Sequence, residues 1–155
     1  MKKVALNMHN AREKQQLVRM QKLKKEKMCF FCEENFLKLG ASPAIYNSKN
    51  WYVKKNDYPY TGSVHHYLII PIKHIDNISA IDEKTFSELH TAIKWLETKT
   101  KVRGYSLFAR SGDMHYTGGT IDHLHFHFLV GGKKIGPSRL KDNILVTLGH
   151  KKTGH

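Results

Sequence analysis

Residues 121–130 read IDHLHFHFLV, and the centre of this segment alternates between histidine and apolar side chains. Because successive side chains of a β-strand point to opposite faces, the alternation predicts a strand. One face would carry Asp122, Leu124, Phe126, Phe128 and Val130, and the other Ile121, His123, His125, His127 and Leu129. Neighbouring histidine rings on the second face would lie about 6.5–7 Å apart along the strand.

Three histidines on one strand face are hard to explain as packing. Core strands favour β-branched and aromatic side chains, since each buried imidazole needs hydrogen-bond partners. An exposed polar face is the alternative, but the opposite face is apolar and the preceding loop is rich in glycine. A histidine cluster suits either metal binding or nucleophilic attack on phosphorus by a neutral imidazole.

The rest of the chain predicts an α+β domain, a mostly antiparallel sheet covered by helices. Apolar runs and turn residues predict two short strands within residues 43–55, separated at residues 47–50, and further strands at residues 66–71 and 105–110. Apolar residues at three- and four-residue steps predict helices over residues 8–28 and 82–103. Asp82 would cap the second helix and Gly104 would end it.

The charge is concentrated at the two ends of the 155-residue chain, whose net charge is +13. Residues 1–28 hold nine basic and two acidic side chains, and residues 131–155 hold six and one. Such ends are either solvated basic arms or a surface for polyanions. The longest apolar run, residues 68–72, is too short to span a membrane, and no secretion signal precedes it, so we expect a cytoplasmic protein without a membrane partner.

Cys29 and Cys32 form a Cys-x-x-Cys pair, CFFC. In a cytoplasmic chain a disulfide is not expected, so this spacing indicates metal binding or redox chemistry. No thioredoxin-like β-α-β pattern surrounds the pair, which favours metal, provided that two further ligands exist.

Three segments together resemble one family. HLHFHFL, residues 123–129, resembles the signature of the histidine-triad (HIT) nucleotide hydrolases and transferases. HYLIIPIKH, residues 66–74, is similar to the second block of that family. NDYPYTG, residues 56–62, looks like a block of its diadenosine-polyphosphate phosphorylase branch. The resemblance covers residues 29–132 and implies a HIT-like α+β fold, with a five-stranded mostly antiparallel sheet, a long amphipathic helix and an N-terminal helix. Residues 1–28 and 133–155 would be basic extensions.

The resemblance also implies a role for each matching residue. His125 matches the nucleophile that forms a covalent nucleotidyl-histidine, with its other ring nitrogen bonded to a backbone carbonyl of the strand. The implied catalytic residues are His125, His127 and His66, and the implied substrate-binding residues are Asn56, Tyr58, Gly119 and Thr120. Zinc-containing branches imply a ligand set of Cys29, Cys32, His74 and His123. Four protein ligands leave no open position, so this zinc would be structural.

The function implied is cleavage of a nucleoside 5′-phosphate, with adenylate as the expected nucleotide, from a leaving group such as a second nucleotide or an amine. The alternative is an aprataxin-like, nucleic-acid-binding enzyme that removes adenylate from nucleic-acid ends, which the basic ends favour. A third reading is a zinc-stabilised scaffold with a degenerate pocket. The family default implies a homodimer. Arg110 departs from the pattern, because relatives carry a substrate-binding asparagine near this position.

Overall fold

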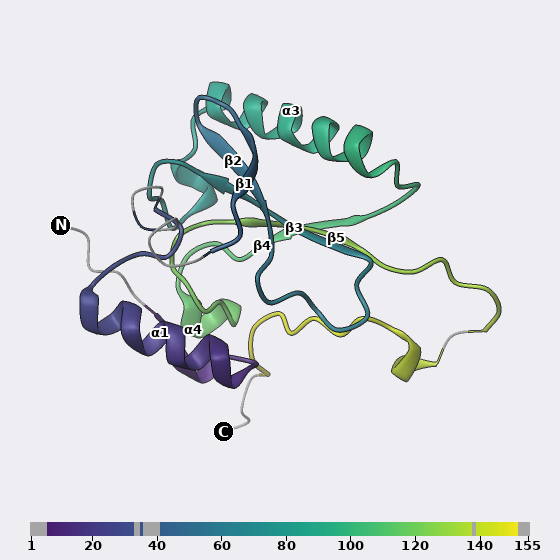
Figure 1. The fold of residues 1–155 in the computed structure, drawn as a ribbon, viewed down its shortest axis with the longest axis horizontal. Coiled ribbons are helices and arrows are strands. Elements are labelled where there is room, and N and C mark those ends of the chain that lie inside the picture. The colour runs from purple at the N-terminus through teal and green to yellow at the C-terminus, as the bar shows by residue number, and fades with distance from the viewer. Residues whose placement is uncertain (1–5, 33–34, 36–40, 138, 152–155) are drawn as a thin grey trace.

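A computed structural model of the chain describes residues 6–32, 35, 41–137 and 139–151 (Figure 1). Its centre is one five-stranded antiparallel sheet with the order β1-β2-β3-β5-β4. The strands are β1 (Ala44–Asn47), β2 (Trp51–Lys55), β3 (His65–Pro71), β4 (Ser106–Ala109) and β5 (Phe126–Val130). The predicted α+β class is confirmed, and the predicted strands at residues 43–55, 66–71 and 105–110 form.

The long helix α3 (Glu83–Thr100) covers one face of this sheet (Figure 1). Its buried residues Leu89, Ala92 and Leu96 pack on the apolar faces of β2, β3 and β5. Asp82 caps the helix as predicted, with its Oδ1 accepting a hydrogen bond from the Thr85 N–H at 2.9 Å. The predicted end at Gly104 is wrong. The helix stops at Lys101, which is left-handed at φ 51°, because the chain turns there to pack Val102 against the core.

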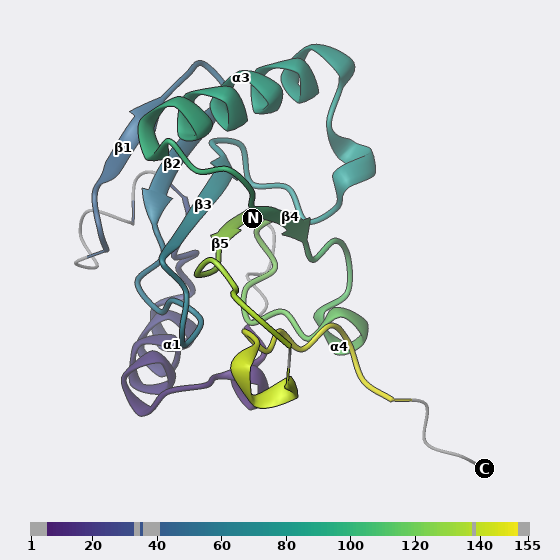
Figure 2. The same ribbon diagram turned by 90° about the vertical axis from the view of Figure 1, so that its right-hand side faces the viewer.

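The opposite face of the sheet carries the basic helix α1 (Lys14–Glu26), which lies with the short helix α4 (Met114–Thr117) on the side away from α3 (Figures 1 and 2). Met20 and Leu23 of α1 are buried, as the predicted apolar face requires. A second apolar cluster forms below this face, made of Leu23, Cys29, Phe30, Phe31, Tyr52, Leu68 and Ile70. Among the described residues, three short 3-10 turns complete the elements, η1 (Met8–Asn10), η2 (Ile78–Ala80) and η3 (Leu140–Asp142).

Two expectations need correction. The predicted strand over residues 121–130 begins only at Phe126, because Leu124 N–H donates instead to the Ile75 carbonyl at 2.7 Å, outside the sheet. The alternation of faces still holds, since Leu124, Phe126 and Phe128 join the core under α3. The loop expected at residues 111–120 contains α4, which Asp113 caps through the His115 N–H. Within the described residues, no helix is long and apolar enough to cross a membrane.

Candidate metal centre and active site

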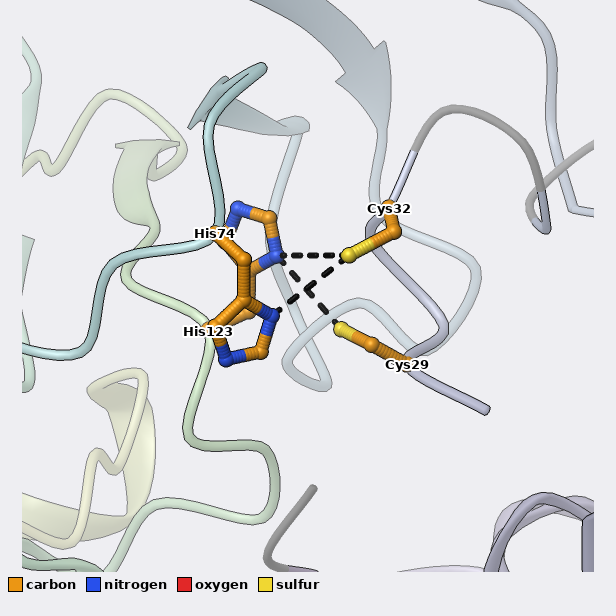
Figure 3. A group of neighbouring side chains, drawn as sticks. All are labelled: Cys29, Cys32, His74 and His123. Atoms are coloured by element: carbon orange, nitrogen blue, oxygen red, sulfur yellow. Dashed lines mark hydrogen bonds between the residues drawn. The ribbon is translucent and has the colours of Figure 1, made fainter. Parts of the chain in front are cut away.

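Four predicted ligands from three distant parts of the chain meet at one point (Figure 3). The ligand atoms of Cys29, Cys32, His74 and His123 all lie within 4.8 Å of one another. Cys29 Sγ lies 3.4 Å from His123 Nδ1, and Cys32 Sγ lies 3.5 Å from His74 Nδ1 and 3.8 Å from His123 Nδ1. The cluster ties the segment before β1 to the loops that follow β3 and precede β5.

This geometry fits a tetrahedral metal ion. With metal–sulfur bonds of about 2.3 Å and metal–nitrogen bonds of about 2.0–2.1 Å, tetrahedral ligands lie about 3.5 Å apart, sulfur to nitrogen. The three observed sulfur–nitrogen distances of 3.4, 3.5 and 3.8 Å agree with that value. Two thiols and two imidazoles form a donor set that binds metal well, so the cluster can hold an ion with four protein ligands.

The surroundings prepare two of the ligands for this role. His123 Nε2 donates to the Pro71 carbonyl at 2.8 Å, which leaves Nδ1 with a lone pair aimed at the sulfurs. The hydrogen bond from the Cys29 thiol is the main cause that lowers the pKa of the Cys32 thiol to about 3. The proton shared with Cys32, together with burial, raises the pKa of Cys29. A thiolate at Cys32 is the form that a metal ion requires.

His125 lies two residues beyond His123 and faces a different space. Its Nδ1 lies 2.8 Å from the His123 carbonyl oxygen, so Nδ1 carries the proton and Nε2 keeps a free lone pair. This backbone partner is the one that the family resemblance implied. The ring packs 4.9 Å from Phe31 and 4.9 Å from His127, centroid to centroid. Burial is the main cause that lowers the pKa of His125 to about 4, which keeps the ring neutral.

His66 and His127 form a chain of hydrogen bonds between β3 and β5. The Tyr60 backbone N–H donates to His66 Nδ1 at 3.1 Å, which puts the His66 proton on Nε2. His66 Nε2 then donates to His127 Nδ1 at 2.8 Å, which puts the His127 proton on Nε2. Burial, aided by Arg12, lowers the pKa of His66 to about 3. Burial likewise lowers the pKa of His127, so both rings are neutral donors.

A cavity between α1 and the sheet receives these side chains, and its lining is partly apolar and partly polar. The apolar lining comes from Met20, Leu23, Phe30, Phe31, Leu68 and Ile121. The polar lining includes Arg12, Arg19, Asn56, Asp57, Tyr58, Tyr60, Arg110, Thr120, His127 and Thr147. The His125 ring contacts both Phe31 and His127. His125 therefore faces a cavity that offers apolar and charged side chains to a ligand.

The predicted substrate-binding residues differ in their placement. Asn56, Tyr58 and Thr120 line the cavity, whereas the lining next to Thr120 comes from Gly118 rather than Gly119. The Gly119 carbonyl accepts from Asn10 Nδ2 at 2.8 Å, and this bond holds the N-terminal segment on the loop. The Asn56 amide nitrogen lies 3.3 Å from His66 Nδ1, so Asn56 also contacts a histidine ring.

Sequence reasoning missed the contribution of both basic ends to this cavity. Arg12, Gln16 and Arg19 reach it from the segment before Cys29, and Thr147 reaches it from beyond Val130. The Gly149 N–H donates to the Thr117 carbonyl at 3.2 Å, which fastens the C-terminal segment beside α4 (Figure 2). Arg110 stood out in the sequence as a departure from the family. The side chains of Arg12 and Thr147 gave no local signal.

Comparisons with known proteins agree with this architecture. Residues 28–136 match the family described as "Scavenger mRNA decapping enzyme C-term binding". A HIT family hydrolase from Clostridium thermocellum is 30% identical, with a TM-score of 0.55 over 72% of this chain and 96% of the other. A hypothetical histidine triad nucleotide-binding protein from Sulfolobus tokodaii strain 7 is 25% identical, with a TM-score of 0.56 over 80% of this chain and 82% of the other.

A histidine triad protein from Clostridium difficile shares the fold at 24% identity, with a TM-score of 0.53 over 72% of this chain and 96% of the other. None of the curated proteins compared matches the chain significantly. The family match spans most of the chain, and the 30% identical relative is covered almost end to end. The chain, with its histidines at residues 123, 125 and 127, therefore belongs to the histidine-triad family.

Proposed function

We propose that this chain is a nucleotidyl hydrolase or transferase that cleaves a nucleoside 5′-phosphate from its leaving group through a covalent nucleotidyl-histidine on His125. The observation that carries the proposal is the bond from His125 Nδ1 to the His123 carbonyl at 2.8 Å. It leaves the Nε2 lone pair free beside a cavity, which is the state that a nucleophilic imidazole needs. Because the His125 ring is neutral and its Nε2 carries no proton, no separate base is needed before the attack.

The chemistry takes place in two balanced steps. The His125 Nε2 lone pair attacks the phosphorus, the bond from phosphorus to the leaving atom breaks, and the leaving group departs with the bonding electron pair, stabilised by a hydrogen bond from His127 Nε2–H and protonated by solvent. A water molecule then attacks the phosphorus of the adduct and releases a proton to solvent, while the phosphorus–nitrogen bond breaks and returns the lone pair to His125 Nε2. His66 supports both steps, because its Nε2–H bond to His127 Nδ1 at 2.8 Å holds the His127 proton on the correct nitrogen.

The mixed apolar and polar lining of the cavity supports a nucleotide substrate. Phe30, Phe31 and Leu68 offer an apolar surface of the kind that holds a base, with Asn56 and Tyr58 as polar partners at its wall. We propose that Thr120 and the backbone at Gly119 contact the phosphate being cleaved, since Thr120 lines the cavity near His125. Adenylate is the nucleotide that the motif resemblance favours.

We propose zinc as the ion of the Cys29, Cys32, His74 and His123 cluster. Two sulfur and two nitrogen ligands at tetrahedral spacing are the donor set that zinc prefers in structural sites. Bound there, the ion would supply no catalytic chemistry and would hold the chain on both sides of His123. The cluster thereby positions His125, whose Nδ1 depends on the His123 carbonyl.

The test is turnover and capture of the intermediate. Purified protein is mixed with diadenosine tetraphosphate or adenosine 5′-phosphoramidate, and the products are separated by chromatography with and without inorganic phosphate. Acid quenching during turnover should yield protein heavier by one nucleotidyl group, attached at His125. Absence of both turnover and adduct would contradict the proposal. Phosphate-dependent release of ADP from diadenosine tetraphosphate would assign the phosphorylase branch that residues 56–62 resemble.

A second candidate, removal of adenylate from nucleic-acid ends, is favoured by one observation. Helix α1 lines the cavity through Met20 and Leu23, while Lys14, Lys22 and Lys25 on its outer face are exposed. A polynucleotide leaving group could contact those lysines. The matched family is described by an mRNA decapping enzyme, which also acts at the end of a nucleic acid. Adenylylated DNA that is cleaved much faster than free dinucleotides would promote this candidate.

We also propose a homodimer, formed at the free edge of the sheet. β4 is an edge strand, and its Leu107 is 40% exposed. A second copy could cover this apolar side chain. Light scattering of the purified protein tests the proposal, and a monomeric mass at micromolar concentration would contradict it.

A further inference from the structure

The cavity holds more positive charge than its own residues neutralise. Arg12, Arg19 and Arg110 line it, and Asp57 is the one acidic residue in its lining. Asp57 is already engaged, because it accepts from Lys54 Nζ at 2.7 Å and from Ser42 Oγ at 2.6 Å, and it lies 3.5 Å from Arg19. Among the described residues no carboxylate therefore pairs with Arg12 or Arg110. An enclosed space with uncompensated guanidinium groups favours an anionic ligand.

Arg110 is held in a fixed position with one nitrogen left over. Its Nε donates to the Thr117 carbonyl at 3.2 Å, and its Nη2 donates to the Thr147 carbonyl at 2.8 Å and to the Tyr60 hydroxyl at 2.9 Å. The remaining nitrogen, Nη1, lies 3.2 Å from His127 Nε2. Three bonds from α4, the C-terminal segment and Tyr60 thus aim Nη1 at the catalytic histidine.

Arg110 Nη1 and His127 Nε2 are both donors. Guanidinium has no acceptor, and the His127 Nε2 carries a proton because His66 donates to Nδ1. Two donors at 3.2 Å cannot satisfy each other, so each can still donate to an acceptor oxygen that lies beside both. A phosphate oxygen is the acceptor that guanidinium binds best.

Arg12 adds a second guanidinium group to the cavity lining, next to Tyr60. Its guanidinium lies over the Tyr60 ring, 4.1 Å from the centroid, while Nη2 donates to the Tyr58 carbonyl at 2.7 Å. Tyr60 therefore separates the two arginines, with Arg12 on its ring and Arg110 on its hydroxyl. The other guanidinium nitrogens of Arg12 have no partner among the described residues, and its side chain is exposed at the cavity mouth.

The order of the rings shows which part of a substrate would meet these arginines. Phe31 contacts His125, His125 contacts His127, and the Tyr60 ring lies 6.0 Å from His127. Helix α1 runs along this line, because Arg12, just before its first turn, lies near Tyr60, whereas Leu23, in its last turns, lies in the cluster with Phe31. With the phosphorus at His125 and the nucleoside at Phe31, the leaving group points toward Arg110 and Arg12.

We propose that Arg12 and Arg110 form an anion-binding subsite for the leaving group, so that the enzyme prefers nucleotides whose leaving group is itself a phosphate chain. This inference rests on the proposed function, because it assigns the nucleophile to His125. It selects dinucleoside polyphosphates over nucleoside phosphoramidates, whose amine leaving group carries no phosphate. Arg110 would contact the first phosphate beyond the broken bond, and Arg12 the next one.

The experiment compares kcat/KM for diadenosine tetraphosphate and adenosine 5′-phosphoramidate in the full-length protein. Arg110→Gln and Arg12→Gln should each lower the ratio of the two values by about tenfold or more, as expected for a lost hydrogen bond to a charged group. Lys24→Gln, an exposed α1 residue outside the cavity lining, is the matched control and should leave the ratio unchanged. Equal losses for both substrates, or no change in the ratio, would overturn the proposal.

A binding measurement separates this inference from the proposed function. In the His125→Ala protein, calorimetry with AMP, ADP and ATP should give affinity that rises with each added phosphate and falls with salt. Adding Arg12→Gln and Arg110→Gln should flatten this series, while the affinity for AMP stays within about threefold. A flat series in the His125→Ala protein contradicts the subsite, even if wild-type turnover is normal. A rising series that the arginine changes flatten supports it, even if no turnover is found.

Discussion

The segment that begins at His123 serves two clusters of opposite character. At its start, His123 joins Cys29, Cys32 and His74 in a group whose ligand atoms all converge within 4.8 Å. Two to four residues later, His125 and His127 share a cavity with arginines and an apolar wall. The first cluster is closed, because every member points inward. The second is open, since among the described residues the His125 Nε2 lone pair has no donor and the His127 Nε2–H has no acceptor.

One hydrogen-bond pattern explains the difference. In the closed cluster the second ring nitrogen of His123 is bound to the Pro71 carbonyl, so the free Nδ1 faces the sulfurs. In the open cluster the His123 carbonyl binds Nδ1 of His125, so the free Nε2 faces the cavity. The nitrogen that the backbone occupies thus decides which ring nitrogen is free, Nδ1 of His123 toward the cysteine sulfurs or Nε2 of His125 toward the cavity. A substitution in the open cluster should therefore lower turnover, and a substitution in the closed cluster should lower stability.

The largest effect is expected at the open cluster. His125→Ala should lower turnover by about four decades or more, since nothing replaces a covalent nucleophile. The protein should still fold and bind the metal, because the ring is not among the converging ligand atoms. Steady-state kinetics, thermal unfolding and elemental analysis check this prediction, with the exposed His115→Ala on α4 as control. Turnover within tenfold of wild type would exclude His125 as the nucleophile.

The closed cluster should behave in the opposite way. Chelation or His74→Ala should lower the free energy of unfolding by several kcal/mol, because binding of a structural metal is coupled to folding. Denaturant unfolding and elemental analysis of protein purified without added metal measure both quantities. His65→Ala, at a histidine nearby in the sequence but outside the cluster, is the control. Protein that carries no metal and keeps its unfolding midpoint in chelator would refute the zinc proposal.

Acid should lower the free energy of unfolding through protonation of His66 in the open cluster. Its pKa of about 3 in the folded protein lies below the ordinary value of 6.5, so the unfolded chain binds the extra proton first. The stability that the neutral ring contributes is present above pH 6.5 and is lost as the pH falls from 6.5 toward 3. For one such group the loss is about 2 kcal/mol between pH 6.5 and 4.5, at about 1.4 kcal/mol per pH unit.

Comparison with His66→Asn isolates this effect. The variant should show a shallower decline of unfolding free energy with acid, whereas release of metal from the closed cluster affects both proteins alike. Denaturant titrations at pH 6.5, 5.5 and 4.5 give the slopes, and His90→Asn on the exposed side of α3 is the control. Parallel slopes for wild type and His66→Asn would show that the His66 ring is not held neutral by the fold.

The smallest effect is expected outside both clusters, on the basic face of α1. Weak binding to a short DNA duplex should fall steeply with salt, because each phosphate contact releases counterions. Lys22→Gln together with Lys25→Gln should reduce the slope of log affinity against log salt by about 0.9 for each lost contact. Cleavage of diadenosine tetraphosphate should be unchanged, since neither lysine lines the cavity. If the two substitutions leave the slope unchanged, the basic face of α1 is excluded as the DNA-binding surface.

Local patterns in the sequence were enough to predict most of the strands and helices of this protein. The alternation around His125 and the three- and four-residue steps of Leu89 and Leu96 predicted elements that form, because they reflect periods of single strands and helices. The ends of elements were less predictable. The strand at residue 121 and the helix end at Gly104 were misjudged because the Ile75 carbonyl and the packing of Val102, contacts from other elements, set those boundaries.

The sequence by itself therefore determined the fold class, and its family resemblance pointed to the four residues that converge as candidate metal ligands. The tertiary structure alone decided which nitrogen of each histidine is free, since that depends on the Pro71, His123 and Tyr60 backbones. It also decided that Arg12 and Thr147, more than 100 positions apart, meet one cavity with Arg110. Periodicity encodes neighbours within an element, whereas contacts between distant segments arise only when the whole chain packs.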